Sequence, residues 1–183
     1  MVETIILALI AAKLRKYKIS GLFKDWAVYP VVLCAIVYTI LEYMVFHGNF
    51  SFLKYTSNFK LIYLLLCVIL IAKYKLYLKG LIGAGCVVIG TVLNNIAIAA
   101  NNGKMPVFPS LTLLTGYIKS DTFIKGNDGL HILGGQAVKL KMLTDIFDVG
   151  YSVMSLGDIF IRTFVFIVIY FSVKGINEKI VSG

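Results

Sequence analysis

Long apolar blocks are the feature that most constrains how this chain can fold. Residues 26–46, 59–74, 78–100 and 156–173 consist mainly of hydrophobic side chains. Each block is near the roughly 20 residues that a helix needs to cross a hydrocarbon core of ~30 Å. The blocks also lack the alternating pattern of half-buried strands. The sequence therefore predicts membrane-spanning helices.

A further block, residues 2–16, has a shorter apolar part that ends at Ala12 and is followed by Lys13, Arg15 and Lys16. A secretory signal carries its positive charges before the apolar region, so the reverse order here argues against a cleaved signal peptide. We expect this block to be an additional span, because lysine side chains at its end extend to the membrane interface.

The composition agrees with a membrane environment. The 183 residues are 59% hydrophobic and 15% charged, whereas soluble domains average about 45–50% and about 25%. The net charge of +9 comes from basic residues beside the apolar blocks, outside any nucleic-acid-binding motif, so no nucleic acid partner is expected. Cys34, Cys67 and Cys86 stand alone in apolar runs, which predicts packing rather than disulfides or zinc. No cofactor and no metal are predicted.

We therefore expect an all-α membrane protein, a single membrane domain over residues 1–183 with about five transmembrane helices. Residues 13–24 and 73–79 are strongly basic and belong on the cytoplasmic side, where positive loops are retained. This orientation places the N-terminus outside, the C-terminus in the cytoplasm and the multi-pass chain in the cell membrane. The long, partly apolar segment 101–155 then lies outside the cell, against the helices or the lipid headgroups.

Polar side chains within the predicted spans are the main candidates for a site. A central Asp, Lys or Arg costs ~2.5–3.5 kcal/mol on insertion scales, so each requires an explanation. Alternating spans bring these residues to the same half of the membrane, where a polar pocket would bind a ligand. The predicted ligand-binding residues are Glu42, Asn94, Asn95, Asn101, Asp158 and Arg162. The alternative is that the small and polar face of residues 90–102 packs against another helix through hydrogen bonds.

Three acidic or basic side chains are candidates for catalysis: Asp145, His131 and Asp158. His131 suits acid–base chemistry near neutral pH, but no metal-ligand spacing joins it to Asp145, so a solvated histidine is the simpler interpretation. Ser155 and Asp158 fit the pattern of a helix capping box. Arg162 follows Asp158 by four residues on the same helix face, which favours an ion pair between them.

Three motifs resemble those of an uncharacterised bacterial family of integral membrane proteins, and the similarity covers essentially the whole chain. They are Asn101-Asn-Gly-Lys-Met-Pro106, Leu143-Thr-Asp-Ile146 and Ser155-Leu-Gly-Asp158. Asn102 stands where the family pattern usually has Gly, and Asn tolerates positive φ, so a turn is still expected. The resemblance implies this membrane layout and no established activity.

Three functions are open. The first is a binding module that takes membrane lipid, a peptide, a hydrophobic small molecule or a membrane protein partner through the polar pocket at the outer leaflet. The second is an outer-leaflet enzyme for a lipid-linked or hydrophobic substrate, with Asp145 or His131 as acid–base group and Arg162 stabilising an anion. The third is an ion- or proton-conducting subunit, since Glu42, Asp158 and Arg162 lie within the spans. We favour the first because no recognisable catalytic constellation is present.

Overall fold

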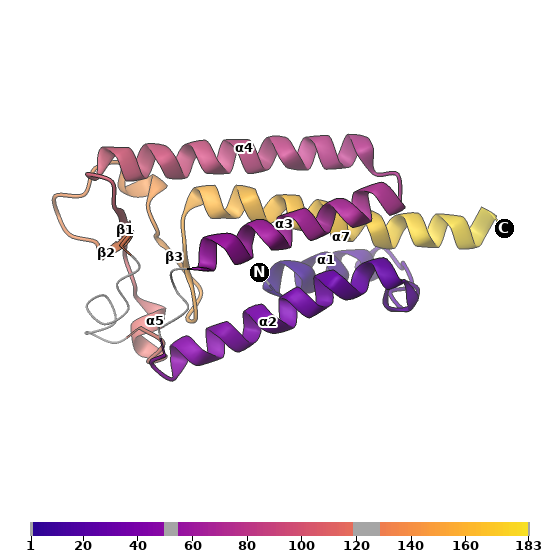
Figure 1. Ribbon diagram of the computed structural model, residues 1–183, viewed down its shortest axis with the longest axis horizontal. Helices are drawn as coiled ribbons and strands as arrows, with labels where there is room; N and C mark the ends of the chain where they lie inside the picture. Colours follow the sequence, from indigo (N-terminus) through magenta and orange to yellow (C-terminus); the bar gives the residue numbers. More distant parts are fainter. Residues whose placement is uncertain (1, 50–54, 119–128, 183) are drawn as a thin grey trace. The chain divides into compact units, whose positions relative to one another are not determined.

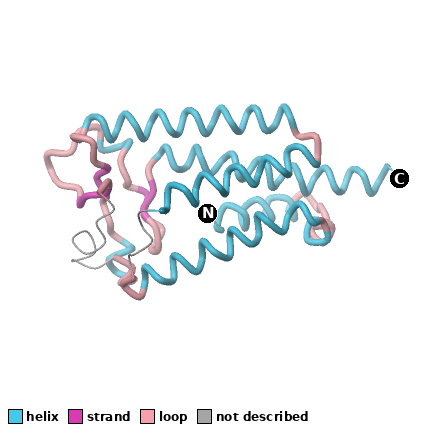
Figure 2. The backbone as a smooth tube through the Cα atoms, viewed as in Figure 1, coloured by secondary structure: helices cyan, strands magenta, loops and turns pink. Residues whose placement is uncertain are grey.

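The computed structural model describes residues 2–49, 55–118 and 129–182. These residues are mostly helical, as Figure 1 and Figure 2 show. The main helices are α1 (Val2–Leu14), α2 (Tyr29–Phe46), α3 (Thr56–Lys73), α4 (Tyr77–Ala100) and α7 (Leu156–Ser182). Two 3-10 turns, Leu22–Lys24 and Trp26–Val28, precede α2.

Each of the five predicted apolar blocks forms a helix. Three helices in the described parts of the chain are long and apolar enough to cross a membrane, namely Trp26–Phe46, Tyr77–Ala100 and Leu156–Glu178. The 13 residues of α1 extend about 20 Å at 1.5 Å per residue, which is less than a hydrocarbon core of ~30 Å. Length and hydropathy together thus support three candidate membrane spans among the described residues.

Segment 101–155 contains short strands, where helices alone were predicted; its residues 119–128 lie outside the described chain. Its elements are β1 (Met105–Val107), α5 (Leu111–Leu114), β2 (His131–Leu133), β3 (Phe147–Asp148) and β4 (Val153–Met154). β1 and β2 pair in parallel with Met105 opposite His131, and β3 and β4 pair antiparallel. Strands of two or three residues are too short for a periodic pattern, so the sequence gives no sign of them.

Contacts gather the chain into two compact units, which are described separately. The first unit comprises Met1–Thr39, Ser57–Val87 and Arg162–Gly183, and the second comprises Ile40–Thr56 and Val88–Ile161. In the first unit, α1, α2, α3 and α7 share one core of buried apolar side chains, among them Ala12, Val31, Leu70 and Val165. The small residues Ala8 and Ala12 on α1 allow close helix packing there.

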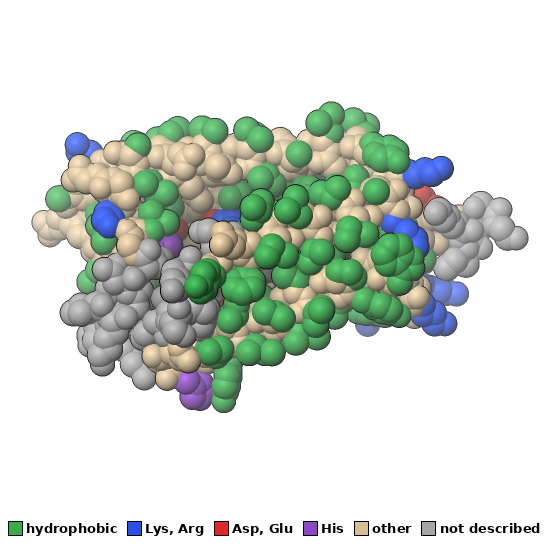
Figure 3. Space-filling model, in the orientation of Figure 1, with side chains coloured by type: hydrophobic (Ala, Val, Ile, Leu, Met, Phe, Trp, Pro, Cys, Tyr) green, Lys and Arg blue, Asp and Glu red, His purple; other side chains and the backbone are tan. Residues whose placement is uncertain are grey.

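The helices also expose much of their apolar surface. In Figure 3, hydrophobic side chains dominate along the helices on the visible face. Only 17% of the apolar window of α4 is buried, and Leu78, Leu81 and Val88 are among its exposed side chains. Soluble monomers rarely expose such long apolar surfaces. The pattern fits helices with apolar surroundings.

Within the second unit, α4 and α7 approach each other at two glycines. A β-carbon on Gly90 would overlap the main-chain oxygen of Gly157, and a β-carbon on Gly157 would overlap both the main-chain oxygen of Gly90 and the side chain of Asn94. Only glycine therefore fits at these two positions without a shift of the helices.

This contact predicts a specific loss of stability for Gly90→Ala. The added methyl group forces the helices apart, and overpacking of this kind costs about 1–3 kcal/mol. We expect the midpoint of thermal unfolding in detergent micelles to fall by several degrees. Gly85→Ala is the matched control on the same helix, because a β-carbon there meets no atom within 4 Å. Equal midpoints for the two variants would contradict the close approach.

Candidate functional site

The polar residues next to the two glycines form a closed seam between α4 and α7. Ser155 Oγ donates to Asn94 Oδ1 at 2.7 Å, and the Asp158 amide donates to Ser155 Oγ at 2.9 Å. Asn94 Nδ2 in turn donates to Asp158 Oδ1 at 3.4 Å. The predicted capping contact of Ser155 is thus confirmed, and the structure brings Asn94 and Asp158 together. Ser155 is fully buried, so this arrangement matches interhelical hydrogen bonding more closely than an open pocket.

Asn101 fastens the end of α4 to the following segment. Its side-chain nitrogen donates to the main-chain oxygens of Ala97 and Lys139 at 2.8 and 2.9 Å, and its oxygen accepts from the Lys139 amide at 2.9 Å. Asn102 and Gly103 follow with φ of +56° and +76°. The predicted turn with Asn102 in place of Gly is therefore confirmed, and Asn101 binds the chain's own backbone.

Asp145 and His131 come together around β1. The Phe108 amide donates to the Asp145 main-chain oxygen at 2.8 Å, and the Asp145 amide donates to the Pro106 oxygen at 3.1 Å. β2, which begins at His131, pairs with β1 as well. The His131 Nε2 atom consequently lies 3.6 Å from Asp145 Oδ2, with the two side chains 41% and 6% exposed. A buried carboxylate beside a half-exposed imidazole can orient the ring.

Asp148 holds the first turn of α5. Its Oδ2 atom accepts from the amides of Ser110 and Thr112 at 2.6 and 2.9 Å and from Thr112 Oγ1 at 2.8 Å. Its Oδ1 atom accepts from the Gly150 amide at 2.8 Å. Burial raises the pKa of Asp148, but these hydrogen bonds outweigh it and hold the pKa below the ordinary value of 3.8. The residue is structural, and its distant partners gave no signal in the sequence.

Glu42 belongs to the part of α2 that lies in the second unit, and it is near Tyr117 and Tyr151 of segment 101–155. Burial and, to a lesser degree, the negative charge of Glu42 raise the pKa of Tyr117 and of Tyr151. The rings of Phe46 and Tyr117 lie 6.5 Å apart, which also joins α2 to this segment. Glu42 is half-buried, whereas the predicted ligand residue Asn95 is exposed on α4.

Arg162 forms an ion pair with Glu3 inside the first unit. Both side chains are largely shielded from solvent, so each charge reduces the cost of burying the other. The sequence suggested Asp158 as the ion-pair partner of Arg162 and missed Glu3. Glu3 is an acidic residue at the start of the shortest apolar block, residues 2–16. This position was the only sign in the sequence that Glu3 could pair with a charge inside the helices.

Together these observations define a mostly helical protein in which three of the described helices are fit to cross a membrane, and in which short paired strands of segment 101–155 precede the last helix. Residues 20–170 match the model of a family of unknown function, DUF5317, and the chain therefore belongs to that family. This confirms the expected membership of an uncharacterised family. No curated protein and no solved structure matches the chain.

The geometry around Asp148 predicts a local loss of structure in Asp148→Ala. Hydrogen bonds to a charged group contribute about 1.5–3 kcal/mol each, so amide exchange in residues 108–116 should accelerate at least tenfold. Hydrogen exchange read by mass spectrometry measures this, with the α4 peptides as internal control. Asp148→Asn, which keeps an acceptor oxygen, should give an intermediate rate.

The same contact has a defined pH dependence. Because the pKa of Asp148 is lower in the folded chain, its stabilisation is present at neutral pH and is lost as the pH falls below about 3.8. Exchange in the unsubstituted protein, corrected for intrinsic rates, should therefore approach that of Asp148→Ala in acid. Identical protection in both proteins at pH 7 would contradict the assignment.

Proposed function

We propose that the chain is an integral membrane protein of about five spans that binds membrane lipid through segment 101–155. The three long apolar helices support the membrane setting, and α1 and α3 complete the count, with Lys13 extending α1 to the interface. The basic residues 13–24 and 73–79 favour a cytoplasmic position. Segment 101–155 and the N-terminus are then outside the cell membrane, and the C-terminus is in the cytoplasm.

The observation that carries this proposal is the placement of side chains in segment 101–155. Asn101 and Asp148 use their hydrogen-bonding groups within the chain, whereas Leu114 and Met142 are 84% and 77% exposed. Leu133 and Leu140 are exposed in the same segment. In a segment surrounded by water, polar side chains are mostly exposed and large aliphatic side chains are mostly buried. The segment therefore suits an apolar neighbour, and lipid acyl chains are the apolar neighbour that surrounds any membrane protein.

Cationic side chains accompany this apolar surface. Lys139 and Lys141 are exposed, and Lys141 Nζ lies 4.3 Å from the centre of the Phe108 ring. A segment at headgroup level places apolar side chains among the acyl chains while ammonium groups meet phosphates. This combination favours a phospholipid over a peptide, a hydrophobic small molecule or a membrane protein partner as the bound species.

Fluorescent labels at two positions test the proposal. In a background with Cys34, Cys67 and Cys86 replaced by Ala, a fluorophore on Leu114→Cys should be quenched by nitroxide-bearing lipids and protected from aqueous iodide. Asn102→Cys is the control, since Asn102 is exposed in a polar turn of the same segment. We expect at least a twofold difference between the two positions. Iodide access at position 114 equal to that at position 102 would exclude lipid contact.

The His131–Asp145 pair favours a second candidate, an enzyme that acts on a lipid-linked or hydrophobic substrate at the outer leaflet. In this candidate Asp145 orients His131, and the exposed imidazole takes a proton from water or from a substrate hydroxyl. Arg162 is left out of the mechanism because its charge is already paired with Glu3. General acid–base groups typically contribute 10²–10⁴-fold to a rate.

Turnover measurements separate this candidate from simple binding. If purified protein hydrolyses a lipid ester or phosphodiester, His131→Ala and Asp145→Asn should each lower the rate by about 10²-fold or more. Asp145→Asn keeps the main-chain bonds to Pro106 and Phe108, so unfolding should be little affected. Gln136→Ala is an exposed control in the same segment, with an expected rate close to that of the original protein. A broad panel of lipid substrates without turnover would rule out the enzyme.

A further inference from the structure

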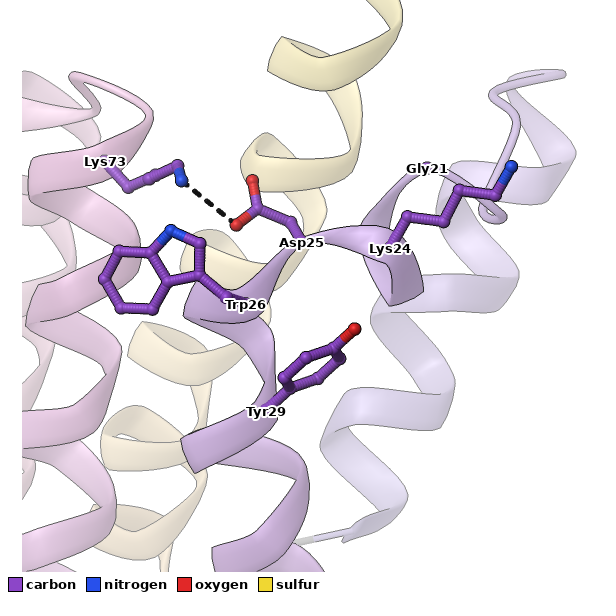
Figure 4. A pocket seen from close by; sticks show the side chains of 6 residues that line it. All are labelled: Gly21, Lys24, Asp25, Trp26, Tyr29 and Lys73. Atoms are coloured by element: carbon purple, nitrogen blue, oxygen red, sulfur yellow. Dashed lines mark ion pairs between the residues drawn. The ribbon is translucent and has the colours of Figure 1, made fainter.

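An open hollow of about 380 Å³ lies in the first unit, where the turns that precede α2 meet the end of α3 (Figure 4). The hollow is separate from the polar clusters of segment 101–155. It lies at the junction of the basic residues 13–24 and the apolar helix Trp26–Phe46. Its lining residues are Gly21, Lys24, Asp25, Trp26, Tyr29 and Lys73.

The single acid in this lining is already engaged by its neighbours. Asp25 accepts from the Ala27 amide at 3.0 Å and from the Tyr74 hydroxyl at 2.8 Å, and it pairs with Lys73 Nζ at 3.2 Å. Lys73 Nζ also lies 4.7 Å from the centre of the Trp26 ring. These contacts fix the carboxylate and the ammonium group in place before any ligand arrives.

The remaining charge in the hollow is positive. Two lysines and one aspartate line it, which gives a net charge of +1 when all three are ionised. In Figure 4, Lys73 reaches Asp25 from α3, Tyr29 lies below Asp25, and Lys24 extends outward on the side of Asp25 opposite Trp26. Lys24 is exposed and so is available to an incoming group. A phosphodiester, with its single negative charge, matches this lining.

An apolar stripe continues from the hollow along α2. Trp26, Tyr29, Leu33 and Ile36 recur at intervals of three or four residues, which places them on one face of the helix. They are 60%, 56%, 63% and 52% exposed. An aliphatic chain can lie along such a stripe while its charged head stays at the lysines. Trp and Tyr at the top of the stripe suit the headgroup level of a membrane.

We propose that this hollow binds the phosphate of an anionic phospholipid, whose acyl chains follow the stripe on α2. Lysines near a membrane surface favour anionic lipid, by about fivefold in affinity for each lysine. Free phosphate shares the headgroup chemistry but makes no use of the stripe. The site shares no residue with the lipid contact of segment 101–155, and it rests on the proposed membrane embedding alone.

The sequence supplies a built-in probe, because Trp26 is the only tryptophan and lines the hollow. The full chain is reconstituted into phosphatidylcholine vesicles that contain brominated phosphatidylglycerol or brominated phosphatidylcholine at equal mole fractions. Bromine quenches tryptophan on contact. We expect Trp26 to prefer phosphatidylglycerol about fivefold or more, and Lys24→Gln to bring this preference close to one. Lys75→Gln, which lies in the other basic stretch, residues 73–79, and outside the hollow, should keep it.

Four results would overturn the inference. Equal quenching by both brominated lipids would exclude headgroup selection while leaving membrane embedding intact, and absence of quenching by either lipid would remove both. An equal loss of preference in Lys75→Gln would assign the effect to overall charge. Displacement of brominated phosphatidylglycerol by millimolar inorganic phosphate would show that the site takes the free anion.

Discussion

The contact of Gly90 with Gly157 is the one on which the second unit depends. It joins the two helices that flank segment 101–155, so that residues 91–156 form a loop whose ends are held together. Closing a loop removes much of the entropy that later pairing inside it would otherwise lose. Strands of two or three residues are marginal alone, and this confinement explains how β1 through β4 can form. The hydrogen bonds of Asn94 with Ser155 and Asp158 fix the register of the two helices.

Within segment 101–155, two polar side chains form hydrogen bonds inside the chain, whereas several large apolar side chains are exposed. Asn101 and Asp148 use their side chains to bind main-chain groups of their own chain. Leu114 and Met142 point outward instead. Asn101, Ser155 and Asp158, which belong to the family motifs, thus form hydrogen bonds within the chain. The proposed lipid binding rests on the exposed apolar side chains of this segment rather than on these polar residues.

Local patterns were readable from the sequence, and distant pairings were not. Each apolar block forms a helix. The last helix, α7, continues beyond the predicted block 156–173 to Ser182, through residues that are less apolar. The Ser155 cap and the turn at Asn102 depend on neighbouring residues, so they were predicted correctly. The ion pair of Glu3 with Arg162, the contact of His131 with Asp145 and the pairing of β1 with β2 join residues far apart in sequence. No periodicity records such pairs, so the candidate site was predicted only in part.

The length of α7 has a consequence for the membrane that would suit this chain. Its apolar stretch, Leu156–Glu178, has 23 residues and extends about 35 Å, against a hydrocarbon thickness of ~30 Å on average. Two hydrogen bonds between Asn177 and Lys18 anchor its far end, which limits how freely it can adjust. A thin bilayer would force this helix to tilt or its lipids to stretch, at a modest cost per ångström. Bilayer thickness would then bias where in the cell such a protein accumulates.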